Sequence, residues 1–463
     1  PKIAYLIVTV FVLALVSVTL PSFARFEHRN PILLDTSWSG NVASSYRRGS
    51  GTVKDPYIIS DGSELAYFAQ MLETTNYSGV YFKLGNNIVL NKGTFSYDEI
   101  NGITYEEDGV TYYVGSYDDA LYTDTNRQNA VSKTVQILPS LKNFAGTFDG
   151  DSYTIYGAYV TDENEDEVGL FTNLSGDVES LYVDNAMIYG GNITGGVAST
   201  AFSSELESVS FRGYVVNSKE KQSVIKEVSL AVDPITLEEN ETIQNFSIAA
   251  SFLENVLLGN VKSVTLTGNL VLSNPSSNVT INGETISSPT FSISLDSNLT
   301  YNLPVVVTGQ AGDSFTFTDV KLVIQSEYSV AGGIVGEADG VTFKNVINKS
   351  DVFGSLYSGG LIGSAIHSTS IADTYNLGTI QSDLTAAGLI GLVQGNNQDV
   401  QVLRSYNAGE ILASNATGIL GDVLNNTGGI LLSTTFDTSD TLYKIHHVQN
   451  STVNVSGSYL ITG

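Results

Sequence analysis

The sequence predicts an all-β protein whose main body is a right-handed parallel β-helix, with an inserted immunoglobulin-like β-sandwich and an N-terminal hydrophobic helix. Two observations carry most of this prediction. A glycine-apolar block recurs along the chain, and the composition favours strands and tight turns over helices. The 463 residues include 44 Gly and 25 Tyr but only 15% charged residues, which suits short strands joined by turns.

The recurring block is a small residue, a glycine, two apolar residues and a second glycine. Its clearest copies are Gly332–Gly336, Gly359–Gly363, Ala387–Gly391 and Thr417–Gly421. Counted at the second residue of each block, the steps are 27 (360 − 333), 28 (388 − 360) and 30 (418 − 388) residues. Weaker copies at Gly146, Gly169 and Gly196 extend the pattern towards the N-terminus, with steps of 23 and 27 residues. A period of this length indicates one structural unit repeated as coils.

A single coil of 23–30 residues cannot bury its own apolar side chains. When coils stack in register, each strand pairs in parallel with its equivalent one coil away, and the apolar side chains line a continuous interior. The crossover rule predicts right-handed winding, and glycine permits bends where a Cβ atom would clash. We therefore expect coils over residues 143–216 and 329–463.

Between these two sets of coils, the pattern is interrupted once. The distance from Gly196 to Gly333 is 137 residues, which is one step of 27 plus about 110 residues. Residues 217–328 lack the block and instead contain alternating apolar and polar stretches such as Ser263–Thr267 and Thr290–Leu295. About seven short strands in this length are typical of an immunoglobulin-like sandwich. Its two ends should lie close together, so that the coils continue.

The block together with the stretch that follows it resembles a known family. Gly359–Gly363 followed by Tyr375–Ile380 is similar to the GLUG motif of bacterial surface proteins, which occurs in large secreted adhesins and in the non-catalytic part of some immunoglobulin A metallopeptidases. The resemblance covers residues 38–92, 143–215 and 329–430. It implies a β-helix on the outside of the cell and supplies no catalytic residues.

The first 24 residues predict export. An uncharged apolar run from Ile3 to Leu20 precedes Ala24, the order typical of a secretory signal cleaved after Ala24. In the alternative, residues 1–20 are retained as a membrane anchor or as the buried core helix of a pilus-like filament. Type IV pilins usually carry glutamate at the fifth mature position, where this chain has Tyr5. The segment thus predicts a secreted or cell-surface protein. Because secreted eukaryotic proteins usually contain disulfides and this chain has no Cys, we expect a bacterial or archaeal source.

Residues 25–92 are predicted to cap the first coil. A helix over residues 62–72 follows from Asp61 as N-cap, Glu64 three residues later, and the helical spacing of Leu65, Phe68 and Leu72. An amphipathic helix placed there would cover apolar side chains at the end of the array. A simple connecting helix is the alternative.

Residues 93–142 form an acidic, tyrosine-rich insertion. Glu106–Gly109 could place carboxylate oxygens around a turn, as in a calcium site. The spacing does not match a regular calcium loop, so we predict a solvated hairpin.

The side chains that could carry catalysis or metal binding are few. The chain has no Cys and no His-Glu-x-x-His motif, and the adjacent His446 and His447 would point to opposite faces of a strand. The acidic cluster between Asp162 and Glu167 has few cations near it in the sequence and is predicted to be a solvated turn. We therefore predict no enzyme activity, no metal and no cofactor.

The net charge of −27 argues against nucleic acid or an anionic membrane surface as a partner. Twelve Asn-x-Ser/Thr sequons are candidate glycosylation sites if the source organism N-glycosylates. They lie at Asn76, Asn173, Asn192, Asn240, Asn245, Asn278, Asn298, Asn348, Asn415, Asn425, Asn450 and Asn454.

These features predict a non-enzymatic exported surface protein, a stalk or adhesin-type scaffold that binds a glycan or a protein. One alternative is a pilin-like subunit that packs against copies of itself through residues 1–20. Another is a carbohydrate-active β-helix enzyme, which a pocket lined by two facing carboxylates, or by a carboxylate and an arginine, would favour.

Overall fold

The structure is a computed structural model. It describes residues 36–114, 135–162, 165–217, 222–229, 234–237, 243–249, 260–273, 279–286, 289–295, 302–394, 400–424, 430–433 and 459–462. Within these ranges, no helix is long and apolar enough to cross a membrane. The predicted signal or anchor over residues 1–24 lies outside them.

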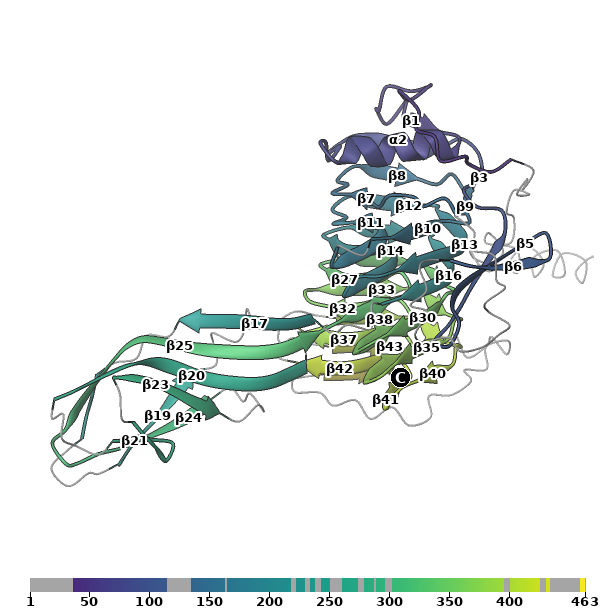
Figure 1. Cartoon of the computed structure of the whole chain (residues 1–463). Coiled ribbons are helices and arrows are strands. Elements are labelled where there is room, and N and C mark those ends of the chain that lie inside the picture. Colours follow the sequence, from purple (N-terminus) through teal and green to yellow (C-terminus); the bar gives the residue numbers. More distant parts are fainter. Residues whose placement is uncertain are drawn as a thin grey trace, which may run out of the picture.

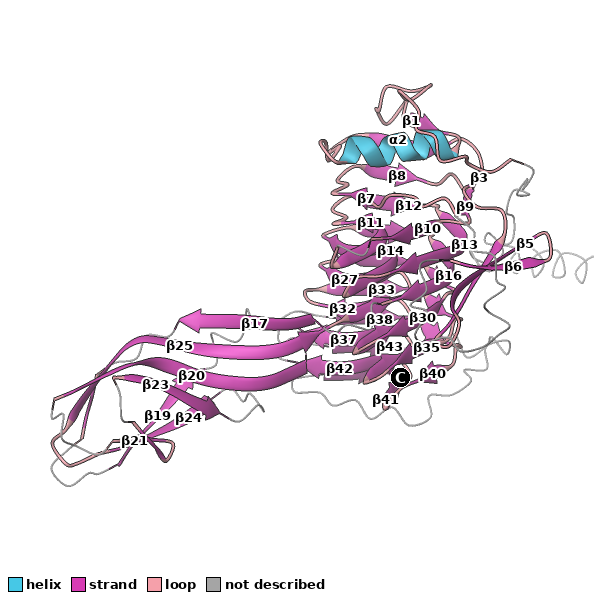
Figure 2. Ribbon diagram, in the orientation of Figure 1, coloured by secondary structure: helices cyan, strands magenta, loops and turns pink. Residues whose placement is uncertain are grey.

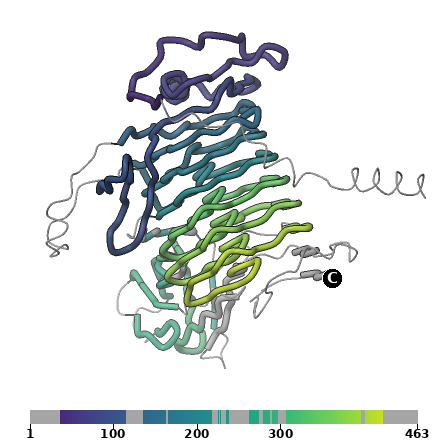
Figure 3. The backbone as a smooth tube through the Cα atoms, turned by 90° about the vertical axis from the view of Figure 1, so that its right-hand side faces the viewer, coloured from purple at the N-terminus to yellow at the C-terminus, as the bar shows by residue number. Residues whose placement is uncertain are grey.

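The main body is a solenoid of stacked coils whose strands form three parallel sheets along its length (Figures 1, 2 and 3). This arrangement confirms the prediction of an all-β fold built from parallel coils. Sheet 1 contains, in order, β1 (Tyr57–Ile59), β2 (Tyr81–Leu84), β8 (Thr147–Asp149), β12 (Asp177–Glu179), β15 (Glu205–Glu207), β28 (Thr342–Lys344), β33 (Thr369–Ala372), β38 (Val400–Leu403), β43 (Ile430–Ser433) and β44 (Tyr459–Thr462).

The other two sheets contain the remaining strands of the coils. Sheet 2 contains β3 (Ile88–Val89), β9 (Thr154–Tyr156), β13 (Tyr182–Tyr189), β16 (Ser210–Val216), β29 (Ile347–Asn348), β34 (Tyr375–Asn376) and β39 (Tyr406–Asn407), with β10 (Tyr159–Thr161), β30 (Asp351–Gly354), β35 (Ile380–Ser382) and β40 (Ile411–Leu412) beside them. Sheet 3 contains β41 (Asn415–Thr417), β36 (Thr385–Ala387), β31 (Tyr357–Gly359), β26 (Val330–Gly332), β14 (Ile193–Phe202), β27 (Val335–Asp339), β32 (Ile362–Ala365), β37 (Ile390–Gln394) and β42 (Leu420–Leu424), with β11 (Glu167–Thr172) and β7 (Leu141–Lys142).

The interior of the solenoid is one continuous apolar cluster, which extends from Ile59 to Leu420. Equivalent residues of successive coils stack in columns, because each strand pairs in register with the next. One such column in sheet 1 consists of Phe148, Val178, Leu206, Phe343, Ile371 and Val402. All six side chains are buried, so each coil covers the apolar surface of its neighbours.

A column of three asparagines runs through successive repeats, in which Asn348 and Asn376 are buried and Asn407 is half-buried. Asn348 Nδ2 donates to Asn376 Oδ1 at 2.7 Å, and Asn376 Nδ2 donates to Asn407 Oδ1 at 2.7 Å. Each amide also closes its own corner, as when Gly378 N–H donates to Asn376 Oδ1 at 3.2 Å. The block glycine makes room for this amide: a Cβ on Gly360 would lie 2.6 Å from Asn376 Cγ.

Helix α2 (Gly62–Leu72) lies across the N-terminal end of the stack (Figure 1). The Asp61 side chain accepts hydrogen bonds from the N–H groups of Ser63 and Glu64 and so caps the helix. Phe68 is fully buried against the first coils, with its ring centroid 4.4 Å from that of Phe82 and 5.9 Å from that of Phe148. The helix therefore covers the apolar end of the interior.

Residues 94–113 form a three-stranded antiparallel sheet, β4 (Thr94–Asp98), β5 (Gly102–Glu107) and β6 (Val110–Tyr113). The prediction of a solvated hairpin is wrong for one of its faces. Phe95 and Tyr105 are both 2% exposed, because they pack with Tyr159, Met187 and Val216 on the outer face of sheet 2. The acidic Glu106–Gly109 turn connects β5 and β6 at the exposed end.

Between the two sets of coils, the chain builds an antiparallel module that projects from the side of the solenoid (Figures 1 and 2). Its first sheet contains β17 (Gln222–Ser229), β25 (Ser314–Tyr328), β20 (Asn260–Leu272) and β23 (Thr290–Leu295), with β18 (Ile235–Thr236) paired to β25. Its second sheet contains β19 (Ile243–Ala249), β24 (Asn302–Thr308), β21 (Thr280–Ile281) and β22 (Glu284–Thr285). One apolar cluster takes Leu266 and Leu322 from the first sheet and Ile281 and Val307 from the second. The module is therefore a two-sheet sandwich.

The solenoid continues across this insertion without a gap. Strand β14 pairs directly with β26 and β27, and β16 pairs with β29 and β30. The chain leaves and re-enters the solenoid at neighbouring points, since Ser329 Oγ donates to Asn217 Oδ1 at 2.9 Å. Tyr328, the last residue of β25, donates its hydroxyl to Glu337 and accepts from Gln394 Nε2 at 3.1 Å. These bonds attach the base of the module to the coils.

The outer face of sheet 1 carries a column of like charges. Asp149, Glu179 and Glu207 stand opposite one another in register on β8, β12 and β15. Burial raises the pKa of Glu179, and the nearby carboxylates of Asp149, Glu207 and Asp177 raise it further, while Lys83 opposes the shift. Ionisation of Glu179 therefore costs folding free energy.

Replacing Asn376 by Ala should lower the free energy of unfolding by about 2 kcal/mol, because Asn348, Asn407 and the corner at Gly378 each lose a partner in a buried site. Urea denaturation followed by circular dichroism measures the change. Gln401, exposed on β38, gives a matched control in which the Ala variant should change stability by less than about 0.5 kcal/mol. Equal effects of the two substitutions would contradict a stabilising role for the asparagine column.

Replacing Glu179 by Gln should stabilise the chain at pH 7. The pKa of Glu179 is higher in the folded chain than in the unfolded chain. The protonated carboxyl therefore favours folding, and this stability is lost as the pH rises through the folded-state pKa. The gain should be about 0.5 kcal/mol, since solvent screens an exposed carboxylate, and it should disappear near pH 4. Thermal melts at the two pH values test this, with the exposed Glu410→Gln as control. A gain that persists unchanged at low pH would show that charge repulsion is not its cause.

Candidate functional site

The candidate site lies on the outer face of sheet 2, where β13 and β16 depart from regular pairing. Their register shifts between Val183 and Ala186, which marks a β-bulge. Asn185 adopts a left-handed conformation in this bulge, with φ of 52°. The facing Gly213 has φ of 145°, and a Cβ atom there would lie 2.0 Å from the Ala186 carbonyl oxygen. The bulge therefore depends on a glycine in the next coil.

The bulge holds the hairpin against the solenoid. Asn185 Oδ1 accepts from the Phe95 N–H at 3.1 Å, and its Nδ2 donates to the Gly93 carbonyl at 2.6 Å. These two bonds connect residues about 90 positions apart in the chain. They fix the start of β4 directly beside the bulged strand.

A pocket of about 350 Å³ lies between β4 and sheet 2. Thr94, Phe95 and Ser96 of β4 form one wall. The remaining wall comes from strands β9, β13, β16 and β30 and from the turn before β30: Tyr156, Asp184, Asn185, Arg212, Gly213, Tyr214, Lys349 and Asp351. Successive coils of the solenoid thus each contribute residues to one cavity.

The pocket collects two cations and two carboxylates in a chain that has only 21 Lys and Arg residues. Arg212 Nη1 lies 3.6 Å from Asp184 Oδ1. The Asp184 side chain is 11% exposed, whereas that of Arg212 is 64% exposed, so the guanidinium has donors that face the solvent. Asp351 Oδ1 accepts from the Thr379 N–H at 2.9 Å, which fixes the second carboxylate.

Tyr156 adds a hydroxyl group to this set. Burial raises the pKa of Tyr156, and the Asp184 carboxylate raises it further, against the opposing effects of a hydrogen bond with Thr94 and of Arg212. The phenol therefore stays protonated at neutral pH and remains able to donate a hydrogen bond. Together with Arg212 and Lys349 it gives the pocket donors, while the two aspartates give it acceptors.

Sequence reasoning singled out none of these residues as a site. Asp184 and Arg212 are single charged residues in otherwise largely apolar strands, and the signal that relates them is only their spacing of one coil, 28 residues (212 − 184). The acidic cluster between Asp162 and Glu167 lies elsewhere: Glu165 pairs with Lys142 at 3.1 Å, and burial raises the pKa of Glu167. His367 pairs with Asp339, and His446 and His447 lie outside the described residues.

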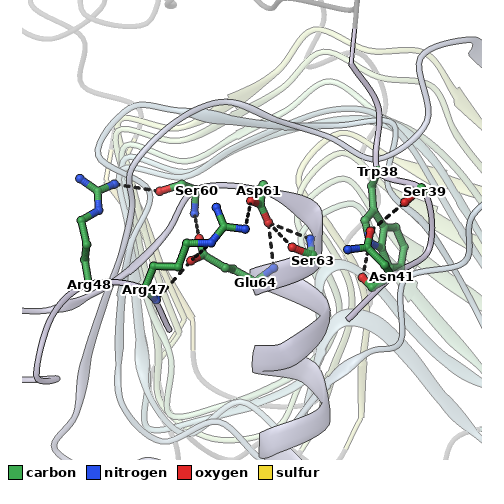
Figure 4. A network of polar contacts seen from close by, with 9 residues as sticks. All are labelled: Trp38, Ser39, Asn41, Arg47, Arg48, Ser60, Asp61, Ser63 and Glu64. Atoms are coloured by element: carbon green, nitrogen blue, oxygen red, sulfur yellow. Dashed lines mark hydrogen bonds and ion pairs between the residues drawn. The ribbon is translucent and has the colours of Figure 1, made fainter. Parts of the chain in front are cut away.

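A second cavity, of about 410 Å³, lies beside the N-terminus of α2. Polar groups in its lining and next to it already bind one another (Figure 4). Arg47 Nη2 lies 2.7 Å from Asp61 Oδ2, and the buried Glu64 accepts from the Ser60 N–H at 2.8 Å. Burial alone would raise the pKa of Asp61, but hydrogen bonds from Ser63 and Glu64 together with the Arg47 charge hold it below its usual value. These contacts make the cavity part of the cap.

The described sequons differ in their surroundings. Asn76 is exposed, Asn173, Asn192 and Asn415 are half-buried, and Asn245 lies on β19. Asn348 is a correction, because its amide is fully buried in the asparagine column and is inaccessible in the folded chain. The remaining six lie outside the described residues: Asn240, Asn278, Asn298, Asn425, Asn450 and Asn454.

The part of the chain that the structure describes contains no group of three or more His, Asp or Glu side chains that could hold a metal ion. The acidic turn Glu106–Gly109 belongs to this part. Lys92 Nζ lies 3.5 Å from Glu107 Oε1 there, so one of the turn carboxylates has a cationic partner.

No family model matches the chain. No curated protein matches it either. A search of solved structures found a crystal structure of a "putative immunoglobulin A1 protease" from Bacteroides ovatus, with 13% sequence identity over 90% of this chain and 86% of that chain and a TM-score of 0.39.

Proposed function

We propose that this chain is a non-enzymatic exported surface protein, in which the solenoid is a stalk or scaffold and the sandwich module projects from its side. The observation that carries this proposal is the unbroken pairing of β14 with β26 and of β16 with β29 across the insertion. The coils before and after the insertion pair directly, so the solenoid can carry the module on its side without interrupting its own strand pairing. Such an arrangement is suited to presenting the module to a partner. We further propose GLUG-type coils and an immunoglobulin-like connectivity for the module.

Export is supported by the sequence. The apolar run that ends before Ala24 has the order of a secretory signal, and the net charge of −27 favours a soluble, repelling surface. The partner we propose is a surface glycan or protein. The pilin-like alternative requires residues 1–20 as an assembly helix.

A carbohydrate-active enzyme is a second candidate, and one specific observation favours it. The pocket beside β4 contains an arginine next to a carboxylate, Arg212 and Asp184, together with Asp351. A carboxylate beside an arginine in one pocket favours such an enzyme. The scaffold remains the better proposal, because it accounts for the coils and the lateral module, whereas the enzyme depends on this one pocket.

Export is tested in cells that produce the native protein. We expect the mature chain to begin at Arg25 by intact-mass measurement and to be degraded by proteinase K added to intact cells, while a cytoplasmic marker survives. A protein that keeps residues 1–24 and assembles into filaments would support the pilin-like alternative instead. Retention in the cytoplasm would exclude both.

The scaffold role is tested by removing the module. Replacing residues 218–328 by a short Gly-Ser linker should leave the coils folded, because Ser329 Oγ already lies 2.9 Å from Asn217 Oδ1 and a short closure costs little entropy. The β-type circular dichroism spectrum and a cooperative thermal transition should be retained. The control is a deletion of residues 333–359, which removes one whole repeat. The apolar pattern of the remaining coils stays in register, so this variant should also fold. Unfolding caused by the module deletion alone would show that the module is part of the scaffold.

A further inference from the structure

The pocket beside β4 is built by two features that coil stacking does not require. The bulge at Asp184 and Asn185 interrupts regular pairing of β13 with β16, and bulges of this kind often re-aim side chains next to functional sites. The hairpin strand β4 is held at the bulge by the Asn185 amide. A solenoid coil would pair more regularly without either feature.

The lining of the pocket combines groups that recognise sugar hydroxyls. Each hydroxyl of a sugar both donates and accepts a hydrogen bond, so it suits a site that offers carboxylate acceptors beside cationic donors. Asp184 and Asp351 supply acceptors, and Arg212 and Lys349 supply donors. The half-buried Tyr156 and Tyr214 add aromatic surface against which the apolar face of a ring can pack.

Charge and size narrow the choice of ligand. The two cations in the pocket are balanced by its two carboxylates, and the chain as a whole carries −27. Long-range electrostatics therefore disfavour an anionic ligand. A volume of about 350 Å³ lies at the small end of ligand sites, which suits a short segment of a saccharide.

We propose that the pocket formed by β4, β13, β16 and the turn before β30 binds a neutral oligosaccharide, with Arg212 and Asp351 as ligand-contacting residues. This deepens the proposed function, because it gives the surface partner a chemical class. The binding itself is measured on the purified full chain. A failure of export therefore leaves the binding result intact, and a failure of binding leaves the export result intact.

The experiment screens the labelled full chain on an array of neutral and acidic oligosaccharides and measures the strongest neutral ligand by titration calorimetry. Arg212→Ala should weaken binding by about tenfold, since it removes charge-assisted hydrogen bonds. Asp351→Asn should weaken it by about fivefold, because it keeps an acceptor for the Thr379 N–H but loses the charge.

Arg404→Ala is the matched control. Arg404 is a half-exposed arginine that pairs with Asp373, Nη2 to Oδ2 at 2.6 Å, outside the pocket lining. Its loss should leave the dissociation constant unchanged, and circular dichroism should show that all variants fold. Asp351→Asn keeps the backbone contact, so it remains informative if Arg212→Ala destabilises the chain.

Three results would overturn the proposal: no binding of any neutral saccharide by the folded chain, equal losses from Arg212→Ala and Arg404→Ala, or binding of acidic saccharides alone. Mass spectrometry of the bound ligand separates binding from catalysis. An intact saccharide supports the proposal together with the scaffold role. Cleavage that Arg212→Ala abolishes would support the pocket and overturn the non-enzymatic role.

Discussion

The repeats from Gly333 to Asn407 depend on one spatial constraint: a side-chain amide packs against a glycine, where a Cβ atom would clash. Gly360 occupies the block and Asn376 the corner of the same coil, and a Cβ on Gly360 would meet both Asn376 Cγ at 2.6 Å and the Gly388 carbonyl at 2.1 Å. The amide in turn donates to the next asparagine. Stacked amides of this kind are typical of strands spaced about 4.8 Å apart. In these repeats the glycine of the block and the asparagine of the corner are complementary, because the amide occupies the space that a Cβ atom would need.

The coils could be predicted from the sequence because the packing of glycine against asparagine requires these residue types at a fixed spacing. Glycine at Gly333, Gly360 and Gly388 and asparagine at Asn348, Asn376 and Asn407 recur with the period of the coil. Asn348 also matches the glycosylation pattern, although its amide is buried in this column. A local motif cannot report whether a side chain faces the solvent.

The pocket could not be predicted, and the reason is geometric. Its residues come from positions in separate coils that are brought together only when the register of β13 against β16 is known, and that register shifts at the bulge. The hairpin was similarly ambiguous. Tyr105 and Tyr112 both belong to an acidic, tyrosine-rich stretch, yet Tyr105 is 2% exposed and Tyr112 is only partly buried against the same cluster. Composition alone could not distinguish them.

The attachment of the module has a mechanical consequence. Only Ser329 separates β25 from β26, so a strand of the module continues almost directly into a strand of the coil. Force applied to the module would reach the solenoid through this strand and through the bonds of Tyr328 with Glu337 and Gln394. Each coil is held mainly by its two neighbours. The few coils at the junction would therefore resist the tension. They would separate from their neighbours before the force reached the rest of the solenoid.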